Sequence, residues 1–133
     1  MPAFLSRLLF EPRLRSARIK TALLLYAGVI AAGSVPGARA EVGELASGVV
    51  LHGLTYGFLS LLCFFGSTGS APVRAAKAVL AVALMGAGDE LVQSFLPYRS
   101  GDVRDWMIDV SAALLTSTLL AVFVSRYEAV RQR

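Results

Sequence analysis

Long apolar runs alternate with short polar connections along this chain. The runs carry few charges, and each approaches or exceeds the roughly 20 residues that an α-helix needs to cross a bilayer. Their apolar positions do not alternate as in barrel strands, and only helices and closed barrels satisfy their backbone groups inside lipid. The pattern predicts four membrane-spanning helices, over residues 19–35, 45–65, 73–96 and 103–124.

Glycine and proline mark the three connections between these runs, at residues 34–37, 66–72 and 97–101. Before the first run, residues 3–10 are apolar and lead towards Pro12. Two predictions fit this stretch: a short helix resting on the inner leaflet, or a frayed tail. The expected fold is all-α, a bundle of four transmembrane helices in one compact domain.

Lysine and arginine are distributed unequally around the runs. With four spans, ten of the 13 basic residues lie on one side, in the two tails and the middle connection. The other side holds Arg39, Arg99 and Arg104. The positive-inside rule then places both termini in the cytoplasm. We therefore expect a multi-pass protein of the cell membrane whose first and third connections face outward.

The composition argues against a soluble protein. Of the 133 residues, 56% are hydrophobic, and the net charge of +4 does not gather on a soluble basic face, so nucleic acid is not an expected partner. The single cysteine, Cys63, cannot form an internal disulfide.

The first run also fits a secretory signal peptide cleaved after Ala38-Arg39-Ala40, which would remove residues 1–40 and leave three spans.

Acidic and polar residues gather at the outer ends of the last two runs. Glu90 and Gln93 are three apart and share a helix face, while three aspartates spaced three and four apart form a stripe down the fourth helix. At the helical rise, these groups and the only histidine lie about 5–12 Å below the outer connections. The candidate ligand-binding residues are Glu90, Gln93, Arg99, Asp102, Asp105, Asp109 and His52.

Ionisable residues inside a membrane are expensive and usually functional, so we interpret this layer as a ligand site. The alternative is that the same side chains only join the helices through charge pairs and hydrogen bonds. We expect no metal and no cofactor, because one histidine among scattered acids does not have zinc spacing. No phosphate loop or nucleotide fingerprint is present.

The residues of the layer follow a spaced pattern: Glu90-x-x-Gln93, Pro97, and Arg99-x-x-Asp102-x-x-Asp105-x-x-x-Asp109. This pattern resembles the signature of VanZ-like membrane proteins, and Leu51-His52 with Tyr56 matches an earlier segment of it. The resemblance covers residues 34–115 and implies one VanZ-like domain, with tails at 1–18 and 126–133 around a bundle at 19–125. The family is bacterial, often has Asn where this chain has Asp109, and is linked with resistance to the glycopeptide teicoplanin.

Three functions remain open. The leading one is a cell-envelope protein that binds the head group of a membrane lipid or lipid-linked envelope precursor, with Arg99 on a phosphate or carboxylate. The second is a membrane-embedded enzyme in which Glu90 or Asp109 is the general acid/base and His52 its partner. The third is a small proton-coupled transporter, against which the nearly apolar inner halves of the last two runs count.

A similar pattern occurs twice in the chain. Pro36 and Pro97 are each followed by an arginine and then by two acids three residues apart: Arg39, Glu41 and Glu44, and Arg99, Asp102 and Asp105. Acids of this kind favour the positive N-terminus of a helix. We therefore predict two related helical hairpins, a parallel repeat about an axis along the membrane normal.

Overall fold

The computed structural model describes residues 3–37, 43 and 46–131, and all regular structure among them is helical. The all-α prediction is confirmed for this part of the chain. In chain order the elements are α1 (Ala3–Phe10), the 3-10 turn η1 (Pro12–Leu14), α2 (Arg15–Gly33), α4 (Gly48–Gly66), α5 (Ala71–Ser94) and α6 (Val103–Arg131).

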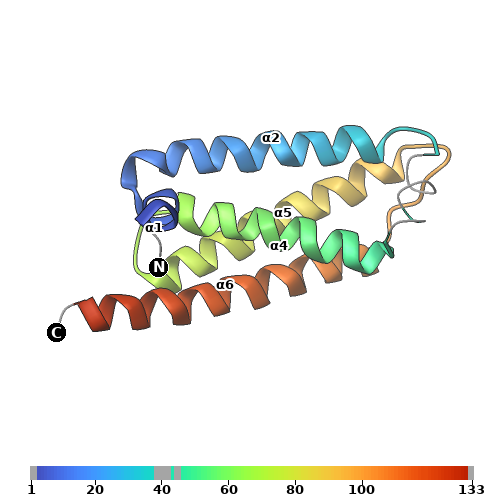
Figure 1. Ribbon diagram of the computed structural model, residues 1–133. Coiled ribbons are helices and arrows are strands. Elements are labelled where there is room, and N and C mark those ends of the chain that lie inside the picture. The colour runs from blue at the N-terminus through green and yellow to red at the C-terminus, as the bar shows by residue number, and fades with distance from the viewer. Residues whose placement is uncertain (1–2, 38–42, 44–45, 132–133) are drawn as a thin grey trace.

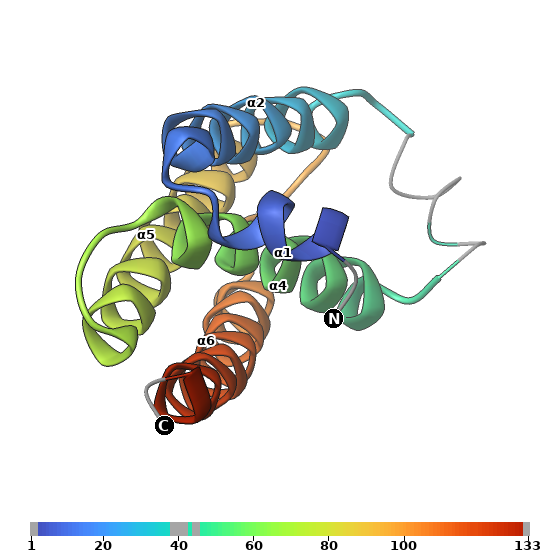
Figure 2. The same cartoon turned by 60° about the vertical axis from the view of Figure 1, so that its left-hand side comes forward.

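The long helices α2, α4, α5 and α6 lie side by side and alternate in direction (Figure 1). Viewed closer to the bundle axis, α4 lies in the centre, where it contacts α2, α5 and α6 (Figure 2). The α5–α6 pair is also in extensive contact. The short helix α1 and the end of α6 lie at one end of the bundle, and the connections after α2 and α5 lie at the other (Figure 1).

The predicted helices agree with the observed ones within a few residues, except that α6 extends to Arg131 and not to 124. Three helices are long and apolar enough to cross a membrane: Pro12–Gly33, Gly48–Gly66 and Val103–Val130. The prediction of membrane helices is confirmed for these three, whereas α5, which carries Arg74, Lys77, Asp89 and Glu90, is not among them.

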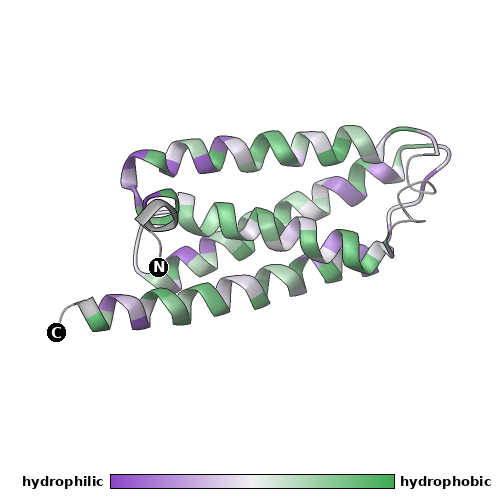
Figure 3. Cartoon of the chain, in the orientation of Figure 1, coloured by the Kyte–Doolittle hydropathy of each residue, from purple (hydrophilic) through white to green (hydrophobic). Residues whose placement is uncertain are grey.

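Hydropathy follows the length of the bundle. Apolar residues fill the middle of the helices, and hydrophilic ones concentrate towards the two ends (Figure 3). Large apolar side chains face outward at mid-helix, among them Leu54 at 71% exposure and Leu115 at 64%. An outward apolar surface of this kind suits a lipid environment, where exposure of leucine costs nothing.

Two buried arginines stabilise the end of the bundle that holds α1. Arg18 donates hydrogen bonds to the carbonyl oxygens of Leu8 and Phe65, and Arg74 donates one to that of Phe64. The last carbonyls of a helix have no partner within the helix, and these guanidinium groups satisfy two of them in α4. The helix predicted for residues 3–10 is present as α1 and is tied to the bundle by Arg18.

Two predictions involve residues outside those described. The signal-like Ala38-Arg39-Ala40 and the acid pair Glu41 and Glu44 fall there, so the cleavage and the repeat stay predictions.

In the connections that are described, Gly37 and Gly69 have φ of +84° and +115°. Side chains rarely adopt such angles, which explains glycine at these predicted turns.

Candidate functional site

Three helices bring the predicted polar residues together at the end of the bundle opposite α1. His52 on α4 lies between two carboxylates of α6: its Nδ1 is 2.9 Å from Asp109 Oδ1, and its Nε2 is 3.6 Å from Asp105 Oδ2. Glu90 on α5 completes the group, since one ligating atom each from His52, Glu90 and Asp105 lies within 4.8 Å of the others. We call His52, Glu90, Asp105 and Asp109 the carboxylate cluster.

Close packing of α5 against α6 positions this cluster. A Cβ atom at Gly86 would lie 2.7 Å from Asp109 Oδ2 and 3.2 Å from the Trp106 ring, so α6 can approach only because residue 86 is glycine. Trp106 adds a hydrogen bond from its indole nitrogen to the Ala83 carbonyl, 3.0 Å long. Gly86 and Trp106 therefore hold α5 and α6 close together beside the cluster.

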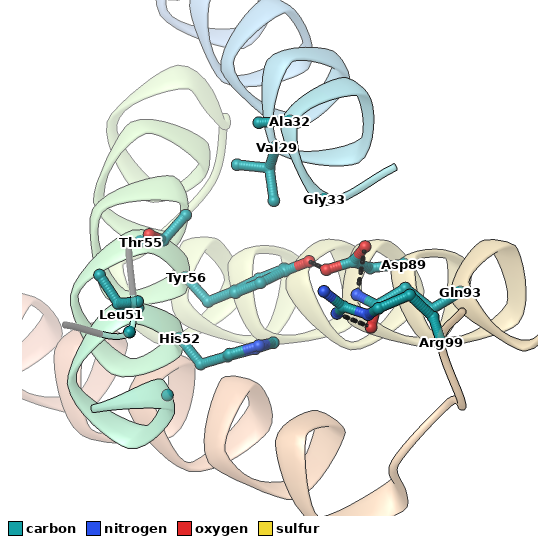
Figure 4. Close-up of a pocket in the computed structure, with 12 residues that line it drawn as sticks. Val29, Ala32, Gly33, Leu51, His52, Thr55, Tyr56, Asp89, Gln93 and Arg99 are labelled. Carbon is teal, nitrogen blue, oxygen red and sulfur yellow. Dashed lines mark hydrogen bonds between the residues drawn. The ribbon is translucent and has the colours of Figure 1, made fainter. Parts of the chain in front are cut away.

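A second group of polar residues connects α4 with α5. Tyr56 donates a 3.0 Å hydrogen bond to Asp89, whose other oxygen accepts one of 2.9 Å from the Gln93 amide. Gln93 in turn accepts a hydrogen bond from Arg99 (Figure 4). Asp89 and Gln93 are only 2% and 3% exposed. The chain of contacts makes Asp89 part of the site, although it was not among the predicted ligand-binding residues.

These residues border a cavity of about 300 Å³ between α2, α4 and α5 (Figure 4). Its lining is polar where α4 and α5 meet and apolar along the face of α2 and part of α4. The polar side consists of His52, Tyr56, Asp89, Gln93 and Arg99, and the apolar side includes Val29, Ala32 and Leu51. An amphiphile with a compact head group matches this division of the surface.

Several buried polar atoms at the site have no hydrogen-bond partner among the described residues. They are Arg99 Nε, Glu90 Oε1 and Asp109 Oδ2. Nearly all buried polar groups in proteins are hydrogen-bonded, so these three atoms are available to bond a ligand, an ion or a water. Arg99 also forms no ion pair with a described acid; its guanidinium contacts the neutral amide of Gln93.

The predicted site residues divide between two adjacent places. Gln93 and Arg99 line the cavity, and Glu90, Asp105 and Asp109 form the carboxylate cluster beside it; His52 belongs to both.

Asp102 lines neither place, because it caps α6. It accepts a 2.8 Å hydrogen bond from the backbone nitrogen of Arg104, while its own nitrogen donates to Glu90 Oε2 at 2.5 Å. Asp102 thus acts as the N-cap of α6, a structural role, and not as one of the residues that line the cavity.

Asp89 and Tyr56 were not among the ligand-binding residues predicted from the sequence. One signal was available for Asp89: it stands four residues before Gln93, and side chains at this spacing share a helix face. The partner of Tyr56 could not be found in this way, because it depends on how α4 and α5 pack.

Comparison with known proteins gives one match. The family model VanZ/LLP1 matches residues 38–124, a range that holds every residue of the carboxylate cluster and all of α4 and α5. No curated protein and no solved structure gives a significant match. The family match covers well over half of the chain and includes the spaced acidic pattern, so the protein belongs to the VanZ/LLP1 family.

Proposed function

We propose that this protein spans the cell membrane four times, with both termini in the cytoplasm and the cavity near the outer face. The helix α5 supplies the fourth span beside the three that are apolar enough on their own. Support comes from the end of the bundle at α1, where Arg7, Arg15, Arg18 and Arg74 gather around one hollow. Basic residues of this density favour the cytoplasmic side.

In this orientation, the cavity binds the anionic head group of a membrane lipid or of a lipid-linked envelope precursor. The observation that carries the proposal is the incomplete hydrogen bonding of the Arg99 guanidinium. Its guanidinium lines the cavity, donates to a neutral amide, and keeps Nε buried without a partner among the described residues. Because the guanidinium fork matches phosphate and carboxylate oxygens, an anionic head group would satisfy it.

The rest of the cavity supports an amphiphilic ligand. Asp89 and His52 offer acceptors and a donor for hydroxyl or amine groups, and the apolar face of α2 at Val29 and Ala32 suits the first part of a lipid chain. A site of this kind also accords with the general link of the VanZ family to glycopeptide resistance.

The substitution Arg99→Gln tests this function. We expect it to weaken binding of undecaprenyl phosphate at least about tenfold, because a charge-assisted hydrogen bond contributes about 1.5–3 kcal/mol. Native mass spectrometry of the detergent-purified chain measures the binding, with uncharged undecaprenol and phosphatidylglycerol as comparison ligands.

Arg104→Gln is the matched control, because Arg104 is exposed and lies near the same end of the bundle. It removes the same charge, yet its side chain forms no hydrogen bond with a described residue. Equal losses in the two variants would contradict a specific site and indicate a general charge effect.

One observation favours catalysis as a second candidate. Asp109 holds His52 through Nδ1, which directs Nε2 towards Asp105 and the nearby Glu90. A histidine oriented by a buried carboxylate is a common general base. Under this proposal, the purified protein hydrolyses a lipid-linked phosphate ester and Glu90→Gln lowers the rate at least about 100-fold. Retained ligand binding without any turnover would exclude it.

A further inference from the structure

We propose that His52 Nε2, Glu90 and Asp105 bind one divalent transition-metal ion of the Zn²⁺ or Mn²⁺ type. The proposal goes beyond head-group binding, because this site lies between α4, α5 and α6, whereas the cavity lies between α2, α4 and α5. It also differs from the expectation drawn from the sequence, in which the spacing of the histidine and the acids did not predict a metal site.

The distances between the donor atoms suit an ion. One atom each from His52, Glu90 and Asp105 lies within 4.8 Å of the others. An ion bound at about 2.0–2.2 Å from each donor separates the donors by roughly 3–3.6 Å. The observed donors therefore lie close enough for side-chain rotations to bring them towards one ion.

Asp109 has the position of a residue that orients a metal-binding histidine. It is fully buried and lies 2.9 Å from Nδ1 of His52, the ring nitrogen that faces away from the other carboxylates. Histidine ligands usually donate this second N–H to a carboxylate or carbonyl, which fixes the ring and raises the basicity of the ligating nitrogen. The position of Asp109 therefore matches the arrangement of a metal site, in which a carboxylate orients the histidine ligand, and not only that of a group of neighbouring acids.

Charge gives an independent reason. Glu90 Oε1, which belongs to the cluster, is buried without a hydrogen-bond partner among the described residues. Arg99 lies nearby, but the hydrogen bond that its guanidinium donates goes to the neutral amide of Gln93 and not to Glu90. A buried carboxylate oxygen without a partner is costly in a low-dielectric interior, where buried charges are paired or bind metal. A divalent cation would offset this charge with protein groups already in place.

The donor set indicates which ion. One imidazole nitrogen with two carboxylates suits Zn²⁺ and Mn²⁺, whereas Mg²⁺ and Ca²⁺ prefer oxygen ligands alone. Three protein ligands also leave a coordination position free, as in catalytic metal sites. That position would be available to an oxygen of a bound ligand.

Titration with Mn²⁺ tests the proposal on the full chain, purified in detergent, stripped with EDTA and free of added lipid. We expect one ion per chain by electron paramagnetic resonance, with a ¹⁴N coupling from the imidazole in pulsed spectra. Zn²⁺ should displace Mn²⁺ at equal concentration, and Ca²⁺ and Mg²⁺ should not. Because no lipid is present, failure of head-group binding and failure of metal binding are separate results.

Variants decide between an ion site and a purely structural cluster. Glu90→Gln should weaken Mn²⁺ binding at least about tenfold, and His52→Gln should abolish the ¹⁴N coupling, while Glu128→Gln at the opposite end changes neither. Circular dichroism checks helix content, and Asp105→Asn replaces either variant that unfolds. Absence of saturable binding, binding retained in both variants, or equal competition by Ca²⁺ would overturn the proposal.

Discussion

Replacing His52 with leucine is expected to lower the free energy of unfolding by about 3–5 kcal/mol, the usual cost of removing one partner of a buried ion pair. The reason is Asp109, whose carboxylate has no exposed surface and lies 2.9 Å from His52 Nδ1. Its other oxygen already lacks a partner among the described residues. Without His52, the buried Asp109 carboxylate would lose its hydrogen-bond partner, and leucine offers none in its place.

The measured value distinguishes two kinds of interaction. A neutral hydrogen bond between membrane helices contributes only about 0.6 kcal/mol on average, so a loss of that size would contradict an ion pair. Unfolding of the purified protein in mixed detergent–SDS micelles, followed by circular dichroism, gives the comparison.

Two further variants serve as controls for this prediction. Asp109→Asn keeps an oxygen beside the ring and removes the charge, so we expect a loss below about 1 kcal/mol. Combining His52→Leu with Asp109→Leu should recover most of the stability, because replacing both partners of a buried pair by apolar groups is often close to neutral.

The helices were predictable because their signal is local. Run length, few charges and the glycine and proline connections located α2, α4, α5 and α6 within a few residues. The end of α6 was missed for a physical reason. Apolar character stops near Val124, but the following residues to Arg131 include no glycine or proline, so nothing ends the helix there.

The contents of the site were predictable only in part. Spacing along α5 and α6 placed Glu90 with Gln93, and Asp105 with Asp109, because side chains three or four apart share a face. Which residue of another helix each one meets depends on axial offset and rotation, which no local pattern encodes. The pairs His52–Asp109 and Tyr56–Asp89 are of this second kind.

Glycines at helix contacts also show that a local sequence pattern does not determine where two helices meet. Residues Gly53 and Gly57 have the spacing of a helix-packing motif, yet an added Cβ at Gly53 would meet nothing within 4 Å. At Gly57 it would lie 3.2 Å from the Thr116 hydroxyl, a tighter approach than most. A crowded contact between α5 and α6, beside the carboxylate cluster, is at Gly86, outside that motif.

Gly86→Leu is therefore expected to destabilise the protein by roughly 3 kcal/mol, at the upper end of the usual cost of overpacking. The first added atom alone would lie 2.7 Å from Asp109 Oδ2, closer than real Cβ contacts allow. Asp109 would have to move, and the distance from its Oδ1 to His52 Nδ1 would increase with it. The substitution should also weaken Mn²⁺ binding, because the residue that orients His52 is displaced.

Gly53→Leu is the matched control for this prediction, since it places the same side chain at a mid-helix glycine with open space around it. Any effect of leucine on the helix itself is common to both variants, so the difference between them isolates the contact of α5 with α6. We expect Gly53→Leu to change stability by no more than about 1 kcal/mol, the size of the helix-propensity difference between glycine and leucine. Equal tolerance of the two substitutions, measured by unfolding in mixed micelles, would mean that α6 does not approach α5 at Gly86.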